Sequence, residues 1–418
     1  MGISNDSIQS AYFKSDYNYG SDSRSIKPKN AIAAFVNDVS TRMIKTFVYP
    51  GASFLKGDFI NPERMEKARE QLLGIGGRSV TMETPDGDKI DGMHLRAKDF
   101  KALIDKYCDY QEEDNGDGTV NQFLTIKAEY CSVVKRQSFS DQSSFDYMQP
   151  NAEADQFIRQ SIKALGIINF PSGELSLEPP VRGYRIELGN VRQDLKKIEE
   201  RSEGSHPTAL ICPGSGMSYA AYKGLAASYL LRGIDVMMVD VRGYGKSGGS
   251  PTAYKTKLDV ETAYQYLSRE LGIKNEDMIV HGHCLGGGPA SDLAARRKGV
   301  NLILDRTFAE YREVARERFP IIKKLVHHIL PSIVDYNNAA NLNRVQGHIG
   351  IVMAIHDTVI HSSQIMKLID NLPYTRKGQE IKLMDFNGEH TGSWTDDAVT
   401  SRQFNQFLEK TGLRQRVF

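Results

Sequence analysis

Gly282-His283-Cys284-Leu285-Gly286 says most about the fold of this chain, because it has the form G-x-C-x-G. An apolar run at 278–280 precedes it, and two further glycines follow it. This context predicts a strand, a sharp turn and a helix, with the central side chain raised out of the turn as in a nucleophile elbow. Glycines on both sides allow the strand and the helix to approach closely. A lone cysteine is more often a small buried hydrophobe, but in this context Cys284 is the candidate nucleophile.

A nucleophile of this kind needs a histidine base and an acid that orients the base. After an elbow they follow along the chain in the order nucleophile, acid, base. His390 lies in a loop after the last strand-like run and is the candidate base, and Asp357, which follows the run at 351–355, is the favoured acid. Asp305, at the end of the run at 302–304, is the alternative acid. Asp305 can also be interpreted as a residue that fixes its loop through a hydrogen bond to local backbone.

The tetrahedral intermediate of such a reaction needs N–H donors for its oxyanion. The backbone N–H of Leu285, the residue after the cysteine, is the first candidate. The second is expected from Ser215 or Gly216, in the loop that follows the apolar run at 209–212. The glycines of this loop also fit a tight turn. Both interpretations hold together, because a turn that exposes N–H groups is what an oxyanion hole requires.

A second glycine-rich stretch contains Gly243, Gly245 and Gly248 in the form G-x-G-x-x-G. Pro251 separates these glycines from the next helical pattern, and no acidic residue ends a second strand at the expected distance, so dinucleotide binding is not indicated. Asp240 stands where a Walker loop needs its first glycine, which argues against phosphate binding as well. We interpret the stretch as a structural loop at the rim of the active site.

The composition, with 40% hydrophobic and 25% charged residues, is ordinary for a soluble globular protein. A formal net charge of +1 gives no general attraction to nucleic acid. The four cysteines have no CxxC spacing, so we expect neither a zinc site nor a disulfide framework, and a reducing compartment is favoured. No apolar run reaches the roughly 18 residues of a spanning helix, and the polar start lacks a signal-peptide core. These features predict a cytoplasmic protein without a cofactor, with effector-like secretion that needs no cleavable signal peptide as the alternative.

From about Thr208 onward, short apolar runs alternate with helical patterns, which predicts a mostly parallel sheet covered by helices on both faces. The runs lie at 209–212, 236–239, 278–280, 302–304, 351–355 and 381–384. Earlier in the chain, two alternating runs on either side of Pro85-Asp86-Gly87 predict a β-hairpin. Residues 97–180 fit neither pattern and are interpreted as an insertion, with a strand-like run at 123–134 and a helix-like segment at 155–165.

The sequence divides into an N-terminal polar tail and helical region at 1–75 and one domain at 76–418 that contains the insertion. Apolar residues at 32–47 have helical spacing. A further helix is expected to begin after the N-cap Asn61 and to end near Gly74. The apolar face of 32–47 has the pattern of a helix that lies on a membrane surface, but its polar face carries only two cations, which favours packing on the catalytic domain.

Together these motifs resemble the α/β-hydrolase superfamily. In chain order they are Pro213-Gly214-Ser215-Gly216, Asp240-x-Arg242-Gly243-x-Gly245-x-Ser247, Gly282-x-Cys284-x-Gly286-Gly287, Asp357 and His390. The resemblance covers about 208–412, with the hairpin at 79–95 as the first two strands. Asp305-Arg306-Thr307-Phe308 is similar to the CHLPS-type bacterial branch. The departure is cysteine in place of serine, a feature in which this chain resembles dienelactone hydrolases and polyhydroxyalkanoate synthases.

The resemblance implies an α/β-hydrolase fold and an acyl hydrolase that acts through Cys284, His390 and Asp357. A thioacyl-enzyme exchanges readily with thioesters, so thioesters or activated esters of small molecules or lipids are the expected substrates. Trp394, the only tryptophan, lies shortly after His390 and is expected to line the pocket. Two alternatives stay open: transfer of the acyl group to an acceptor other than water, and a binding or effector protein that has this fold with little catalytic power.

Overall fold

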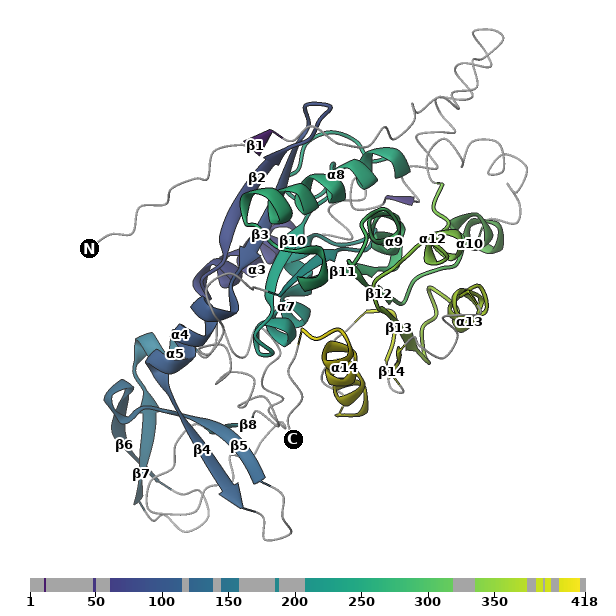
Figure 1. Ribbon diagram of the computed structural model, residues 1–418. Helices are drawn as coiled ribbons and strands as arrows, with labels where there is room; N and C mark the ends of the chain where they lie inside the picture. Colours follow the sequence, from purple (N-terminus) through teal and green to yellow (C-terminus); the bar gives the residue numbers. More distant parts are fainter. Residues whose placement is uncertain are drawn as a thin grey trace, which may run out of the picture.

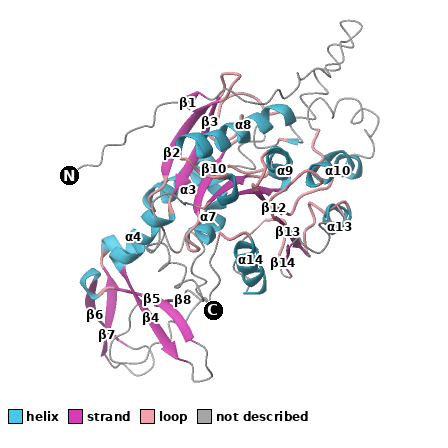
Figure 2. Cartoon of the chain, in the orientation of Figure 1, coloured by secondary structure: helices cyan, strands magenta, loops and turns pink. Residues whose placement is uncertain are grey.

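The computed structural model describes residues 11–12, 48–49, 61–114, 120–137, 144–157, 185–187, 207–318, 335–373, 381–385, 388–391 and 398–413. At their centre lies one large, mostly parallel sheet with helices on both faces (Figures 1 and 2). In spatial order its strands are β1 (Ala11–Tyr12), β2 (Arg78–Glu83), β3 (Lys89–Leu95), β10 (Asp235–Val239), β9 (Thr208–Cys212), β11 (Met278–His283), β12 (Asn301–Asp305), β13 (Ile349–Ala354) and β14 (Ile381–Asp385). Strand β3 runs antiparallel to both of its neighbours, and the other neighbouring pairs are parallel.

The apolar runs form strands because both faces of the sheet are buried, so side chains of both orientations must be apolar. In β9, Ala209 and Ile211 belong to the core on one face, and Leu210 and Cys212 belong to the core on the other. The first face is covered by α3 (Pro62–Gly74), α7 (Lys223–Leu230) and α14 (Ala398–Lys410). The second is covered by α8 (Ala253–Gln265), α9 (Gly287–Arg296), α12 (Asn338–Leu342) and α13 (Ser362–Asp370). All six predicted runs are confirmed as strands.

The predicted hairpin is confirmed as β2 and β3, which pair in antiparallel register from Arg78 opposite His94 to Glu83 opposite Lys89. Its turn contains Gly87, whose φ of +86° is in the left-handed region that favours glycine. The hairpin lies beside β10, and this contact joins the N-terminal part of the sheet to the parallel strands.

The helix predicted after Asn61 is also confirmed. The Asn61 side chain accepts a hydrogen bond from the Arg64 N–H at 3.0 Å, which satisfies one of the free donors of the first turn. Helix α3 then buries Ala68 and Leu72 in the core. The helix predicted at 32–47 lies outside the described residues.

The insertion forms small sheets of its own, at the lower left of Figure 1. It contains α4 (Ala97–Tyr107), β4 (Cys108–Asp114), β5 (Val120–Ile126), β6 (Cys131–Gln137), β7 (Ser144–Pro150), α5 (Ala152–Phe157) and β8 (Arg185–Glu187). The strand-like run at 123–134 is two strands, because a 3-10 turn at Ala128–Tyr130 interrupts it. Strand β8 pairs with β5, so this pairing extends past the predicted boundary at 180. The predicted helix at 155–165 begins earlier, as α5, and residues 158–165 lie outside the described residues.

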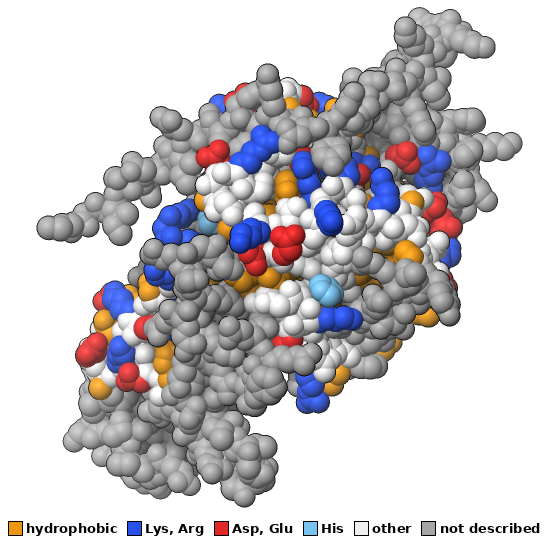
Figure 3. All heavy atoms as spheres, in the orientation of Figure 1, with side chains coloured by type: hydrophobic (Ala, Val, Ile, Leu, Met, Phe, Trp, Pro, Cys, Tyr) orange, Lys and Arg blue, Asp and Glu red, His pale blue; other side chains and the backbone are white. Residues whose placement is uncertain are grey.

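The surface of the described region is mixed in charge. On the face shown in Figure 3, Lys and Arg side chains lie among Asp and Glu side chains, in keeping with the formal net charge of +1. In the parts of the chain that the structure describes, we find no helix that combines the length and the apolar character needed to cross a membrane.

Candidate active site

The turn after β11 has the geometry of a nucleophile elbow. Cys284 has a φ of +50°, in the left-handed region that a residue with a side chain rarely adopts. A Cβ on Gly282 would lie 2.6 Å from the Ala290 Cβ, and one on Gly286 would lie 2.1 Å from the Cys212 carbonyl oxygen. Both positions therefore require glycine, as the sequence indicated. The strained turn leads through a short 3-10 segment (Cys284–Gly286) into α9 and leaves the thiol half-buried.

The structure brings His390 and Asp357 together across the carboxyl edge of the sheet. His390 Nδ1 lies 2.8 Å from Asp357 Oδ2. The other oxygen of the buried Asp357 carboxylate accepts the N–H groups of Val359 and Ile360, each at 2.8 Å, which fixes its orientation. Cys284 also lies close enough to His390 to help raise the pKa of its ring. Cys284, His390 and Asp357 thus lie in the order of a nucleophile, a base and an orienting acid.

The electrostatics of the site favour a positively charged His390. Burial lowers the pKa of His390, but the hydrogen bond to Asp357 and the interaction with Cys284 outweigh burial and raise it to about 10. Burial raises the pKa of Asp357, and the hydrogen bond from His390 outweighs burial and holds it below its usual range. The pair is therefore an imidazolium held by a carboxylate, which is the state that stabilises a neighbouring thiolate.

This charge state predicts how stability depends on pH. Histidine in an unfolded chain has a pKa of about 6.5, whereas that of His390 in the folded protein is about 10. The folded state binds more protons than the unfolded state between these values, so the stabilisation is complete below the lower value and is lost as the pH rises through the upper one. We expect the free energy of unfolding, measured with urea, to fall more steeply over this range in the wild type than in His390→Gln. Parallel curves for the two proteins would contradict a charged His390.

Asp305, the alternative acid, is paired with other side chains. Arg306 Nε donates to Asp305 Oδ1 at 2.8 Å, and His281 Nε2 lies 3.2 Å from Asp305 Oδ2. The local backbone bond that the sequence suggested for Asp305 stays a prediction. Burial raises the pKa of Asp305, but the Arg306 charge and the His281 bond hold it well below its usual range. In the described region, Asp357 is the carboxylate that contacts the His390 side chain.

The loop after β9 passes directly beside the thiol. A Cβ on Gly214 would lie 3.1 Å from the Cys284 Cβ. The Gly214 N–H is engaged, since it donates to Tyr222 Oη at 2.8 Å. The Ser215 carbonyl accepts a 2.7 Å hydrogen bond from Tyr244 Oη, which fixes the orientation of the next peptide group. The N–H groups of Ser215 or Gly216, together with that of Leu285, stay the predicted oxyanion donors.

A pocket with about 280 Å³ of space free of protein atoms, part of it open to solvent, lies beside the elbow. Its lining includes Tyr49, Ser215, Tyr244, Leu285, Pro289 and Tyr336. Burial raises the pKa of Tyr49, Tyr244 and Tyr336, so their hydroxyls stay protonated and can donate hydrogen bonds. Sequence reasoning missed these tyrosines, which come from distant segments. Trp394, which it placed in the pocket, lies outside the described residues.

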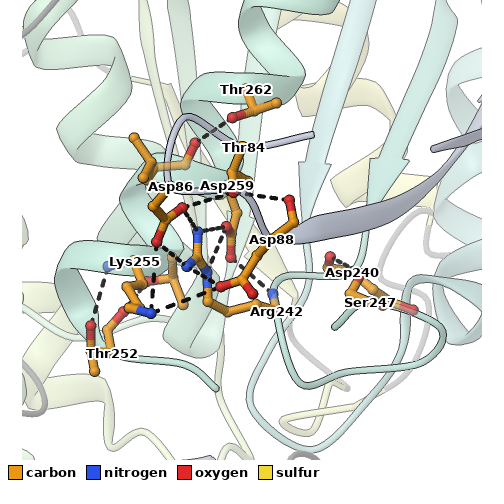
Figure 4. A network of polar contacts seen from close by, with 12 residues as sticks. Thr84, Asp86, Asp88, Asp240, Arg242, Ser247, Thr252, Lys255, Asp259 and Thr262 are labelled. Carbon is orange, nitrogen blue, oxygen red and sulfur yellow. Dashed lines mark hydrogen bonds and ion pairs between the residues drawn. The ribbon is translucent and has the colours of Figure 1, made fainter. Parts of the chain in front are cut away.

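Arg242, in the second glycine-rich stretch, ties that stretch to the hairpin and to α8 (Figure 4). Its guanidinium is fully buried and bonds to Asp259 at 2.6 Å, to Asp86 at 2.7 Å and to Asp88 at 2.6 Å. Burial lowers the pKa of Arg242, but the Asp86 and Asp259 contacts outweigh burial and raise it further above its usual range. The arginine is thus committed to internal ion pairs and holds the loop beside the active site.

The described residues contain no group of three or more His, Cys, Asp or Glu side chains placed to hold a metal ion. The cysteines at positions 108, 131, 212 and 284 are free thiols.

Comparisons with known proteins add to the geometry. Residues 205–344 match the model of a family described as serine aminopeptidase, S33. An uncharacterized membrane protein of Saccharomyces cerevisiae is 27% identical over 232 residues, which cover 52% of this chain and 78% of that protein. A multifunctional-autoprocessing repeats-in-toxin protein of Vibrio cholerae is 29% identical over 175 residues, which cover 42% of this chain and 3% of the toxin.

A solved structure, the Pyrococcus furiosus esterase Pf2001, aligns with 81% of this chain and 91% of its own, with a TM-score of 0.45 and 13% sequence identity. The finer resemblance to the CHLPS-type branch stays a prediction. The strand order, the elbow after β11 and the matched segment lead to one conclusion: this chain has the α/β-hydrolase fold, with residues 205–344 similar to the serine aminopeptidase, S33 family.

Proposed function

We propose that this protein is a hydrolase of ester or thioester bonds that acts through a covalent thioacyl-enzyme on Cys284. One observation carries the proposal: a thiol at a strained elbow lies beside a histidine whose Nδ1 is bound to a buried carboxylate. A nucleophile, a base and an orienting acid in this arrangement are the requirements for acyl transfer.

Acylation begins from an ion pair in which the Cys284 proton already resides on His390 Nε2. The thiolate sulfur then attacks the acyl carbon, and the carbonyl electron pair moves to oxygen. The N–H groups of Leu285 and of Ser215 or Gly216 hold this oxyanion. When the tetrahedral intermediate collapses, the bond to the leaving group breaks, and His390 gives its proton to the departing alcohol or thiol. The product of this half-reaction is the thioacyl-enzyme.

Deacylation repeats these steps with water. His390 takes a proton from a water molecule, whose oxygen attacks the thioester carbon. The second tetrahedral intermediate releases the Cys284 thiolate, and the acyl group leaves as a carboxylic acid. The imidazolium of His390 restores the ion pair with the thiolate, and Asp357 stabilises that charge throughout.

The thiol also supports a second candidate function, which is transfer of the acyl group to an acceptor other than water. A thioester to the enzyme exchanges with incoming thiols at little cost in energy, because the bond that forms and the bond that breaks are alike. The pocket beside the elbow is lined largely by tyrosine and apolar side chains, which limits the number of water molecules close to the acyl group.

Direct capture of the thioacyl-enzyme tests the proposal. The full chain is mixed with an aryl acetate, quenched in acid within one turnover and digested, and the cysteine peptides are analysed by mass spectrometry. We expect one acetyl group on the Cys284 peptide, with release of an equal amount of aryl alcohol. The Cys108 and Cys131 peptides serve as internal controls for non-specific acylation.

The same experiment separates the alternatives. Acetylation of Cys284 followed by steady release of acetate supports the hydrolase. Acetylation that persists until a thiol or an alcohol is added supports the transferase. Absence of acetylation, with aryl and thioester donors of several chain lengths, would overturn both and leave a binding protein.

A further inference from the structure

The loop that carries His390 is fixed by its backbone as well as by its side chain. Three consecutive carbonyl groups of this loop accept hydrogen bonds from groups at the ends of three neighbouring strands, β13, β12 and β11. The bonds run from His356 N to Gly388 O, from Arg306 Nη1 to Glu389 O and from His283 Nε2 to His390 O, each 3.0 Å long. The third bond holds the backbone of His390, the proposed base.

The partners of His283 determine its tautomer. A carbonyl oxygen can only accept, so Nε2 must carry the proton that is shared with the His390 carbonyl. The other ring nitrogen, Nδ1, lies 2.7 Å from Tyr222 Oη. Burial lowers the pKa of His283 to about 3, so the ring is neutral and Nδ1 accepts the Tyr222 proton. Tyr222 Oη can then accept from the Gly214 N–H, at 2.8 Å.

These bonds form a directed chain that links both sides of the site. It begins at Gly214 in the oxyanion loop, passes through Tyr222 and His283, and ends on the backbone of His390. His283 is adjacent to Cys284 in sequence, so the residue before the nucleophile also touches the residue that activates it. We propose, on the basis of the function proposed above, that His283 is a positioning residue that sets the distance between the His390 ring and the Cys284 thiol.

A neutral histidine suits this role for an electrostatic reason. The rings of His283 and His390 are 5.1 Å apart. A cation at position 283 would repel the imidazolium of His390 at this distance, whereas a neutral ring supplies the N–H donor without a charge. The other charged or titratable groups that face His283 are Tyr222, Asp305 and Arg306, and the latter two are paired with each other.

Two conservative replacements separate the two ring nitrogens. The amide of glutamine can reach the position of Nε2, so His283→Gln keeps a donor for the His390 carbonyl. The amide of asparagine reaches only the position of Nδ1, so His283→Asn keeps the Tyr222 contact and loses the bond to His390. The readout is the rate at which iodoacetamide alkylates Cys284, followed by peptide mass spectrometry as a function of pH, because the thiolate is the reactive form.

We expect His283→Asn to lower the alkylation rate near neutral pH by about 10-fold, the effect of losing one positioning hydrogen bond, and to shift the pH profile upward. His283→Gln should restore most of the rate. If the role of His283 were purely structural, both variants would change stability, and their alkylation rates would not differ in this way. Wild-type pH profiles in both variants would overturn the proposal.

Tyr222→Phe gives a second, independent measurement that keeps the proposal testable if His283→Asn does not fold. It removes the donor to His283 Nδ1 and should shift the profile in the same direction by a smaller amount, and an unchanged profile would contradict the proposed chain. Alkylation needs no substrate, so these outcomes stand whether or not the protein hydrolyses esters. If the wild-type protein hydrolysed no ester, that result would count against the proposed function alone.

Discussion

Replacing Cys284 with alanine is expected to lower kcat/KM for an aryl ester or an acyl-thioester by on the order of 10⁴- to 10⁶-fold, as removal of an activated nucleophile does in related mechanisms. The remaining rate would come from substrate binding and from the oxyanion donors, which the substitution leaves in place. Cys284→Ser should give an intermediate rate, because the hydroxyl is a nucleophile but does not form a stable ion pair with His390. Steady-state hydrolysis of both substrate types, with all variants at equal concentration, measures these differences.

Cys131→Ala is the matched control for this experiment. It makes the same chemical change at a free thiol that lies in the insertion, at the start of β6. We expect its kcat/KM to equal that of the wild type. If Cys284→Ala retained full activity, Cys284 would not be the nucleophile, and the reaction would take place elsewhere.

The Arg242→Met substitution should destabilise the folded protein by about 3–5 kcal/mol, the usual effect of leaving a buried charge without its partner. The Arg242 and Asp259 side chains are both fully buried, and in this variant the Asp259 carboxylate would have no cation in contact. Burial already raises the pKa of Asp259 to about 6 against the attraction of Arg242, which shows how costly its charge is at this place. Urea unfolding near neutral pH measures the change in the free energy of unfolding.

A second substitution tests the physical reason for this loss. The double variant Arg242→Met/Asp259→Asn has no unpaired charge. In the wild type the backbone N–H of residue 242 donates to Asp259 at 2.8 Å, and the asparagine side-chain oxygen can still accept this bond. The double variant should therefore be more stable than Arg242→Met alone. Lys246→Met serves as the control, since the Lys246–Glu66 pair is half-exposed and should contribute less than about 1 kcal/mol. Equal losses in the Arg242 and Lys246 variants would contradict the argument from burial.

The parts of the fold that could be predicted from the sequence are those in which the tertiary environment of a residue restricts which amino acid can stand there. The parallel strands could be located because strands buried on both faces must be apolar throughout. The elbow could be located because Gly282 and Gly286 leave no room for a Cβ, a constraint that is visible as glycine in the sequence. Asp357 and His390 could be chosen because each follows a strand at the same edge of the sheet.

The features that sequence reasoning missed depend on contacts between distant segments. Tyr222 and His283 are 61 positions apart, and nothing in the sequence near either residue indicates that they meet. Tyr49 lines the pocket from a position between β1 and β2 in the sequence. Helix α4 was missed although Phe100, Ile104 and Tyr107 are buried with helical spacing, a signal that the Lys and Asp residues between them obscured. The 3-10 turn at Ala128–Tyr130 has no comparable signal.

The network around Arg242 has a consequence for the segment that resembles other proteins. Residues 205–344 include Arg242 and Cys284, but two carboxylates of that network, Asp86 and Asp88, precede the segment. Asp357 and His390 follow it. The segment that matches the family model is therefore not a unit that could be excised: cut out by itself, it would contain Cys284 without His390 and an arginine without two of its three counter-ions.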